Sequence, residues 1–277
     1  MADAKRSTRE SMHDAAERSA TPRDDAFYVG YAKMPAELTR FLRGLLPALL
    51  LSSAVLAWLL ARAQNDPGDG LWDSGVSREF SGLVLAEPYP HLRITGESGA
   101  PETLLLVEVG KFGGGQRAAA FDGSAARISG WVLERDGRRM LEMEPGDSLR
   151  PDSALTGAAL ERLRSARVAP RGRVRLRGEI VDSKCYLGAM KPGEGRPHKE
   201  CATLCIAGGI PPMLVTADAA GRRSYALLTD SDGRGLAGGA LRAVLPFVAD
   251  AVEVSGVLEQ RDDVTILRLD RDGVRRL

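Results

Sequence analysis

The sequence has almost no net charge and few aromatic side chains. Its formal charge is +1 at pH 7, and phenylalanine, tryptophan and tyrosine together make up 5% of the 277 residues. A protein that binds nucleic acid through its charge needs a basic excess, and one that binds single strands also needs aromatic rings on which bases stack. We therefore expect no nucleic-acid partner for this chain.

The common catalytic motifs are also missing from the sequence. It has neither a G-x-S-x-G element nor an H-E-x-x-H element. The stretch KFGGGQ (111–116) lacks the Gly-Lys-Ser/Thr ending of a phosphate-binding loop, so we interpret it as a flexible turn. The carboxylates of Asp262 and Asp263 fall in a predicted turn, where we expect them to be solvated. We therefore favour a binding protein over an enzyme.

Cysteine is scarce and unevenly placed. All three cysteines, with one of the three histidines, lie in DSKCYLGAMKPGEGRPHKECATLC (182–205). Pro197 predicts the start of a short helix there, and Gly208-Gly209 predicts its end. On that helix His198, Cys201 and Cys205 stand at i, i+3 and i+7, which is one face. The loop that carries Cys185 can fold back over this face.

These four side chains form a Cys3His donor set. Such a set suits tetrahedral zinc, and it also suits copper(I) or an iron–sulfur cluster. The predicted ligands are Cys185, His198, Cys201 and Cys205. We expect Asp182 to accept a hydrogen bond from the histidine, and Lys184 to lie beside the thiolates and lower their pKa.

The same cysteines allow two other interpretations. In an exported domain, Cys185 can form a structural disulfide with Cys201 or Cys205, which leaves one thiol over. Alternatively, Cys201 and Cys205 can exchange disulfides with a substrate. Three functions stay open on the sequence alone: a metal-binding module that serves a respiratory or metal-handling complex, a tethered thiol–disulfide oxidoreductase, and a disulfide-stapled interaction scaffold.

One apolar run is long enough to cross a membrane. Residues 44–61 read GLLPALLLSSAVLAWLLA, without a charge, and 18 helical residues reach roughly 27 Å. Basic residues favour the N-terminal side, which is then cytoplasmic. We predict a single transmembrane helix over 44–63 in a bacterial inner membrane, a cytoplasmic tail over 1–43, and the remaining chain in the periplasm. A signal peptide cleaved after ARA (61–63) and a buried core helix are the alternatives.

Two segments beyond this run resemble each other. RISGWVLERDGRRMLEME (127–144) matches EVSGVLEQRDDVTILRLD (253–270), and EFSGLVLAE (79–87) matches RLRGEIVDS (175–183). Each longer segment reads as two alternating strands joined by a short turn. The spacing from Gly82 to Gly130 is 48 residues, whereas that from Gly178 to Gly256 is 78. The second copy is therefore longer by about the length of the cysteine segment.

We accordingly predict a mainly β fold after the membrane helix. Its parts are a linker (64–77), a first β unit (78–145), a linker with a short helix (146–171), and a second β unit (172–277) with a Cys/His-bearing insertion over 182–212. About five short strands with a helix before the last hairpin indicate a small OB-like barrel, with a β-sandwich as the alternative.

The cysteine segment also resembles a motif of uncharacterised bacterial membrane-anchored or exported proteins. The motif reads D-x-K-C, then H-x-x-C-A-x-x-C, then G-x-P. The matching residues are Asp182, Lys184, Cys185, His198, Cys201, Ala202, Cys205, Gly209 and Pro211. The resemblance implies an OB-like domain outside the cytoplasmic membrane and brings no established activity.

Overall fold

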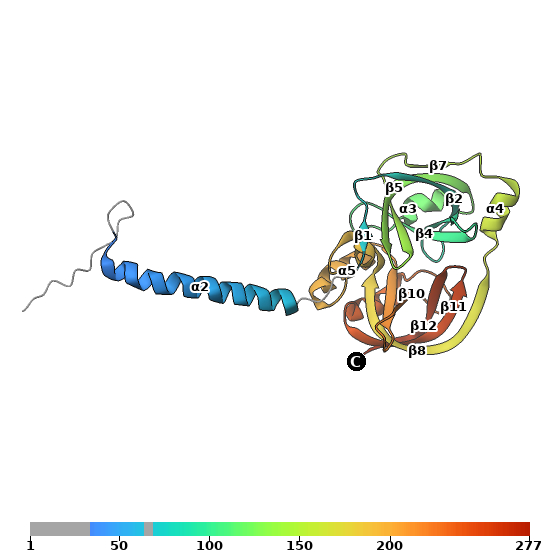
Figure 1. The fold of residues 1–277 in the computed structure, drawn as a ribbon. Coiled ribbons are helices and arrows are strands. Elements are labelled where there is room, and N and C mark those ends of the chain that lie inside the picture. The colour runs from blue at the N-terminus through green and yellow to red at the C-terminus, as the bar shows by residue number, and fades with distance from the viewer. Residues whose placement is uncertain (1–33, 64–68) are drawn as a thin grey trace, which may run out of the picture. The chain divides into compact units, whose positions relative to one another are not determined.

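The chain is seen in a computed structural model that describes residues 34–63 and 69–277 (Figure 1). It divides into one unit that ends at Asn65 and a second unit from Asp66 to Leu277. What we predicted for residues 1–33 of the tail and 64–68 of the linker lies outside the described residues.

The described part of the first unit is one helix, α2 (Ala36–Ala63). It begins before the predicted start at residue 44, and it is long and apolar enough to cross a membrane. None of its residues is buried within the described structure, whereas a core helix would be covered by protein. A signal sequence near the N-terminus has the same properties.

The second unit contains two closed barrels, and the first has five strands. Antiparallel pairs join β2 to β3, β3 to β4, β2 to β5 and β5 to β6, and a parallel pair between β4 and β6 closes the barrel. The strands are β2 (Arg78–Leu85), β3 (His91–Thr95), β4 (Pro101–Val107), β5 (Ala125–Arg135) and β6 (Arg138–Met143). Two short strands, β1 (Leu71–Trp72) and β7 (Leu149–Pro151), pair with β5.

The second barrel repeats this topology strand for strand. Its closing parallel pair joins β10 to β12, and the other four pairs are antiparallel. The strands are β8 (Val168–Asp182), β9 (Pro212–Ala217), β10 (Arg223–Thr229), β11 (Ala251–Arg261) and β12 (Val264–Arg276). Short helices precede the last hairpin in both barrels, α3 (Gly115–Ala118) with η1 (Ala119–Phe121) and α6 (Gly238–Val244) with η4 (Leu245–Phe247). Helix α4 (Gly157–Arg164) connects the barrels. The predicted pair of OB-like units is confirmed.

Four glycines explain why the two copies look alike in sequence. A Cβ atom on any of them would lie 2.1 to 2.4 Å from a carbonyl oxygen of the neighbouring strand. They form two equivalent pairs, Gly82 with Gly178 in the first strand of each barrel and Gly130 with Gly256 in the fourth. Only glycine permits this close approach of the backbones in a small barrel.

The cysteine segment is an insertion between the first two strands of the second barrel. Residues 183–211 separate β8 from β9, whereas only residues 86–90 separate the equivalent strands β2 and β3. The insertion folds into η2 (Cys185–Ala189), η3 (Arg196–His198) and α5 (Lys199–Ala207). Pro197 lies at the start of η3, which leads directly into α5, and Gly208 caps the end of α5. Both positions were predicted.

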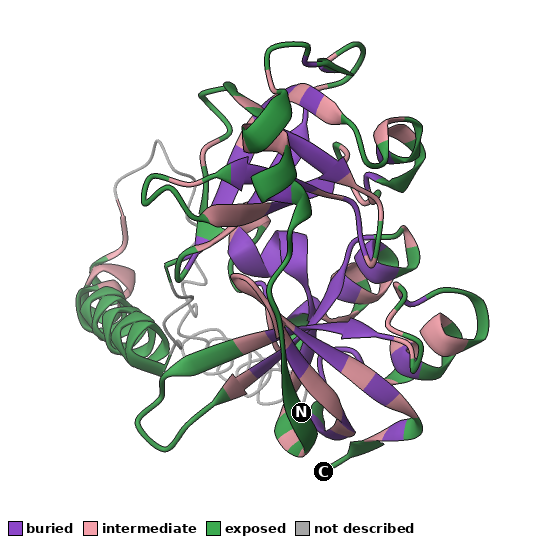
Figure 2. Ribbon diagram, turned by 90° about the vertical axis from the view of Figure 1, so that its right-hand side faces the viewer, coloured by how far each residue is buried: buried purple, intermediate pink, exposed green. Residues whose placement is uncertain are grey.

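The insertion packs between the barrels. One apolar core combines Leu133 and Met140 of the first barrel with Tyr186, Leu187 and Cys205 of the insertion. Figure 2 shows buried segments that continue from one barrel to the other. The two barrels and the insertion therefore share one apolar core rather than a solvated interface.

The turn between β11 and β12 also belongs to this interface. Arg93 of the first barrel donates to Asp262 at 2.6 Å, and both side chains are largely buried. The backbone nitrogen and hydroxyl of Thr103 donate to Asp263 at 2.9 and 2.8 Å. The expectation that these two carboxylates are solvated was wrong, because they bind groups on the opposite barrel.

The glycine-rich stretch 111–116 is held against the end of α5. The backbone nitrogen of Gly113 donates to the carbonyl oxygen of Gly208 at 2.9 Å. A Cβ atom on Gly208 would lie 1.9 Å from the carbonyl oxygen of Lys111. We interpreted this stretch as a flexible turn, but its glycines serve a close contact between two backbones.

Gly208→Ala should therefore destabilise the protein. The added methyl group cannot fit without separating the two backbones, and we expect the free energy of unfolding to fall by about 1–3 kcal/mol. Urea unfolding of the purified chain measures this loss. Gly239→Ala is the matched control, because a Cβ atom there meets nothing within 4 Å. Equal stability of the two variants would contradict the packing described here.

Candidate metal site at the thiol cluster

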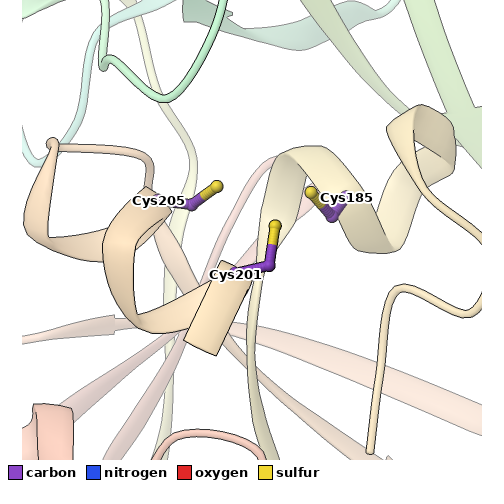
Figure 3. Close-up of side chains that lie close together, drawn as sticks. All are labelled: Cys185, Cys201 and Cys205. Carbon is purple, nitrogen blue, oxygen red and sulfur yellow. The ribbon is translucent and has the colours of Figure 1, made fainter. Parts of the chain in front are cut away.

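The three cysteines converge on one point. Cys185 lies at the start of η2, and Cys201 and Cys205 lie one turn apart on α5. Their sulfur atoms are all within 4.8 Å of one another, and Figure 3 shows the three side chains directed toward a common space. All three lie within the described residues, and no disulfide joins them there. Cys185 and Cys205 are buried, whereas Cys201 is half-buried.

His198 and Asp182 form a second group around Cys185. The Nε2 atom of His198 lies 3.0 Å from Asp182 Oδ2, and the backbone nitrogen of Cys185 donates to Asp182 Oδ1 at 2.7 Å. A ring nitrogen, a carboxylate oxygen and the Cys185 sulfur lie within 4.8 Å of one another. The structure therefore arranges the predicted donors as two adjacent groups that share Cys185, rather than as one group of four at that spacing.

A lysine that the sequence analysis missed contacts the sulfurs. Lys111 Nζ donates to Cys201 Sγ at 2.7 Å and to Cys205 Sγ at 3.6 Å. It comes from the first barrel, 90 residues before Cys201, and it stands in the stretch that Gly113 and Gly208 hold in place. Nothing local in the sequence links this lysine to the cysteines.

Lys184 has a different position from the one we expected. Its ammonium group is buried and donates to the Glu108 and Gly110 carbonyl oxygens at 2.8 and 2.7 Å and to Glu142 Oε1 at 2.7 Å. These three acceptors take all three ammonium protons, so none is left for a thiolate. Lys184 therefore fixes the insertion to the first barrel, and Lys111 is the cation at the sulfurs.

The thiols have strongly shifted pKa values. A hydrogen bond between Cys185 and Cys205 lowers the pKa of Cys205 to about 7, and the charge of Lys111 adds to this effect. The same hydrogen bond, together with burial, raises the pKa of Cys185. The hydrogen bond to Cys201 raises the pKa of Lys111 to about 12. Without a metal ion, the pair of Cys185 and Cys205 therefore releases one proton as the pH rises through about 7 and keeps the other.

A methionine sulfur stands at the edge of the cluster. The Sδ atom of Met190 lies 3.5 Å from Cys201 Sγ. Thioether sulfur is a soft donor, as thiolate is. The sequence analysis did not single out Met190, because a methionine after a turn is far more often a packing residue than a ligand.

The donor set fits a thiophilic metal ion. Zinc binds thiolate at about 2.3 Å, which in tetrahedral geometry sets neighbouring sulfurs about 3.8 Å apart. The three sulfurs are already within 4.8 Å of one another, so a small adjustment of side chains suffices. Cys185, Cys201 and Cys205 would hold the ion, and His198 stands next to Cys185 with its ring fixed by Asp182.

Comparisons with protein-family models, with curated proteins and with solved structures give no match for this chain. The geometry of the site therefore carries the functional argument.

The buried pair of Lys184 and Glu142 should respond differently to single and double substitution. Lys184→Met leaves the Glu142 carboxylate buried without a counter-charge, and we expect the free energy of unfolding to fall by about 3–5 kcal/mol. Adding Glu142→Leu removes that charge and should restore most of the loss. Urea unfolding measures both variants.

The control for this pair is Arg164→Ala, which removes an exposed ion pair with Glu161 and should change stability by less than about 1 kcal/mol. A double variant as unstable as Lys184→Met alone would show that the carboxylate is not the source of the loss.

The thiolate content of the metal-free protein should change near neutral pH. Because the pKa of Cys205 lies at about 7, below that of an ordinary thiol, thiolate ultraviolet absorbance should rise as the pH passes upward through that value. Lys111→Met removes a positive charge from the site and should move the midpoint to higher pH, whereas Lys191→Met, at an exposed position of the insertion, should not. An ordinary thiol midpoint in the unsubstituted chain would contradict this assignment.

Proposed function

We propose that the chain is a membrane-anchored binding module whose thiol cluster holds one thiophilic metal ion, zinc or copper(I). The observation that carries this proposal is the convergence of three unpaired sulfurs within 4.8 Å on rigid elements. Thiolates that bind different irons of a cluster stand farther apart than thiolates that share one ion, so this spacing favours a single ion over an iron–sulfur cluster.

Each donor has a defined role in this proposal. Cys185, Cys201 and Cys205 provide the thiolates, and His198 provides the imidazole. The contact of His198 with Asp182 is the arrangement that commonly orients a metal-binding histidine. Lys111 contacts the sulfurs of Cys201 and Cys205, and its positive charge offsets part of the negative charge that the thiolates carry when they bind the ion.

The proposed location is a bacterial inner membrane, with the N-terminus in the cytoplasm and both barrels in the periplasm. Helix α2 supports the anchor by its length and composition, and the basic residues that precede it in the sequence support the orientation. The proposed partner is a respiratory or metal-handling complex in the same membrane. Its support is the combination of an anchor with a site for a soft metal ion.

A second candidate function is thiol–disulfide exchange. The lowered pKa of Cys205 and the ammonium group of Lys111 favour it, because a thiolate is the attacking species. The Cys205 thiolate would attack a substrate disulfide and release one substrate thiolate. A neighbouring cysteine thiolate would then attack the mixed disulfide and release the second substrate thiol. This candidate ranks second because Cys205 is only 1% exposed.

The metal content and thiol count of one sample test the proposal. The full chain, purified in detergent without chelator, should contain about one zinc or copper ion per chain. Its three thiols should react fully only after a chelator removes the ion. Cys201→Ser should lose the ion, and His198→Ala, which removes the imidazole ligand, should bind it more weakly than the unsubstituted chain. Glu200→Gln, exposed on the same helix, should retain it.

Other results would replace the proposal with a defined alternative. A metal-free chain with a disulfide that exchanges with added thiols would support the oxidoreductase. A metal-free chain with an inert disulfide, unchanged by His198→Ala, would support the disulfide-stapled scaffold.

A further inference from the structure

A pocket of about 550 Å³ lies against the thiol cluster. Its lining includes Cys185 and Cys205, but most of its wall belongs to the first barrel and takes no part in the proposed metal site. We propose that this pocket binds a small, neutral, flat apolar molecule that carries one hydrogen-bond donor. The ligand would lie against two indole rings and donate to Glu142.

The walls of the pocket suit a flat ring. Trp72 of β1 and Trp131 of β5 both line it, with Val109, Pro145 and Met190. Trp72 is 38% exposed, and Trp131 is half-buried. An indole offers a large apolar face that stacks well on another ring. The only other tryptophan of the chain is Trp58, so two of three tryptophans lie in this pocket.

The polar end of the pocket is a carboxylate with an unused acceptor. Glu142 stands directly opposite Trp131 in the pairing of β5 with β6, so the two side chains leave the sheet on the same face. Glu142 is 2% exposed. Its Oε1 accepts from Lys184, but its Oε2 has no hydrogen-bond partner among the described residues.

The unpaired Oε2 atom of Glu142 indicates that the ligand carries a hydrogen-bond donor. A buried acceptor without a partner has lost its hydrogen bonds to water and gained none in return, which is unfavourable. Lys184 cannot supply a further proton, since its other two protons are taken by the Glu108 and Gly110 carbonyl oxygens. Glu142 lines the pocket, and an N–H or O–H group of a ligand that reaches Oε2 would satisfy it while Lys184 keeps its three acceptors.

The charges around the pocket select a neutral ligand. Lys184 and Glu142 neutralise each other at 2.7 Å. A cation would also stand near Lys111, and an anion would face the Glu142 carboxylate. The three groups on which recognition depends, Trp72, Trp131 and Glu142, are not metal donors. The pocket proposal is therefore independent of the proposed metal ion.

A fluorescence titration of the full chain in lipid nanodiscs tests this proposal. In a Trp58→Phe background, Trp72 and Trp131 are the only tryptophans. The probe is β-naphthol, a neutral flat molecule with one O–H donor, and its methyl ether is the matched ligand without the donor. We expect saturable quenching by β-naphthol, with binding of the ether about tenfold weaker because Oε2 stays unpaired. Empty nanodiscs correct for partition into lipid.

Two variants locate the binding. Trp131→Leu should weaken β-naphthol binding about tenfold or more, and Glu142→Gln should abolish the preference over the ether. Phe112→Leu is the control, because Phe112 is exposed and does not line the pocket. If Glu142→Gln does not fold, the two ligands compared on the Trp58→Phe chain still decide the question.

Some results would overturn the proposal. They are quenching that does not saturate, quenching that Trp131→Leu leaves unchanged, or equal affinity for the two ligands. Cys201→Ser distinguishes failure of the pocket proposal from failure of the metal proposal, because Cys201 does not line the pocket. Quenching by β-naphthol should persist in that variant even though it loses the metal ion.

Discussion

The buried ion pair between Lys184 and Glu142 is the contact on which the site depends. The two groups meet at 2.7 Å, and their side chains are 5% and 3% exposed. Lys184 directly precedes Cys185, so the pair fixes the first sulfur relative to the first barrel. Its two carbonyl acceptors belong to the loop that carries Lys111. Separating these buried charges would leave each without its counter-charge, so the contact holds the insertion in one position.

The two barrels have the same topology but contribute different parts of the site. The second barrel carries a long insertion where the first has a short connection, and all three sulfurs lie in that insertion. The barrels supply rigid strand ends, and the first barrel also contributes the cation at the sulfurs and the indole-lined wall. Neither barrel alone contains the complete site, and the interface between them is closed by a shared apolar core and by buried ion pairs.

The sequence predicted those features that depend on local patterns. The spacing of Gly82, Gly130, Gly178 and Gly256 indicated the duplication, because small barrels need glycine where their strands approach closely. The helical spacing in the insertion brought Cys201 and Cys205 to one face. The contacts of Lys111 and Asp262 were not predictable in this way. Each depends on how one barrel packs against the other, and a docked turn has the same local sequence signals as a solvated one.

The closing pair of β10 with β12 has a consequence for biogenesis. Strand β12 is the last strand of this barrel in chain order, so the barrel that holds the insertion closes only after β12 has been synthesised. Until then the insertion lacks the closed barrel that carries it, and the contacts of Lys111 with Cys201 and Cys205 are not yet fixed. The proposed ion would therefore meet its complete set of donors only after this last strand has paired.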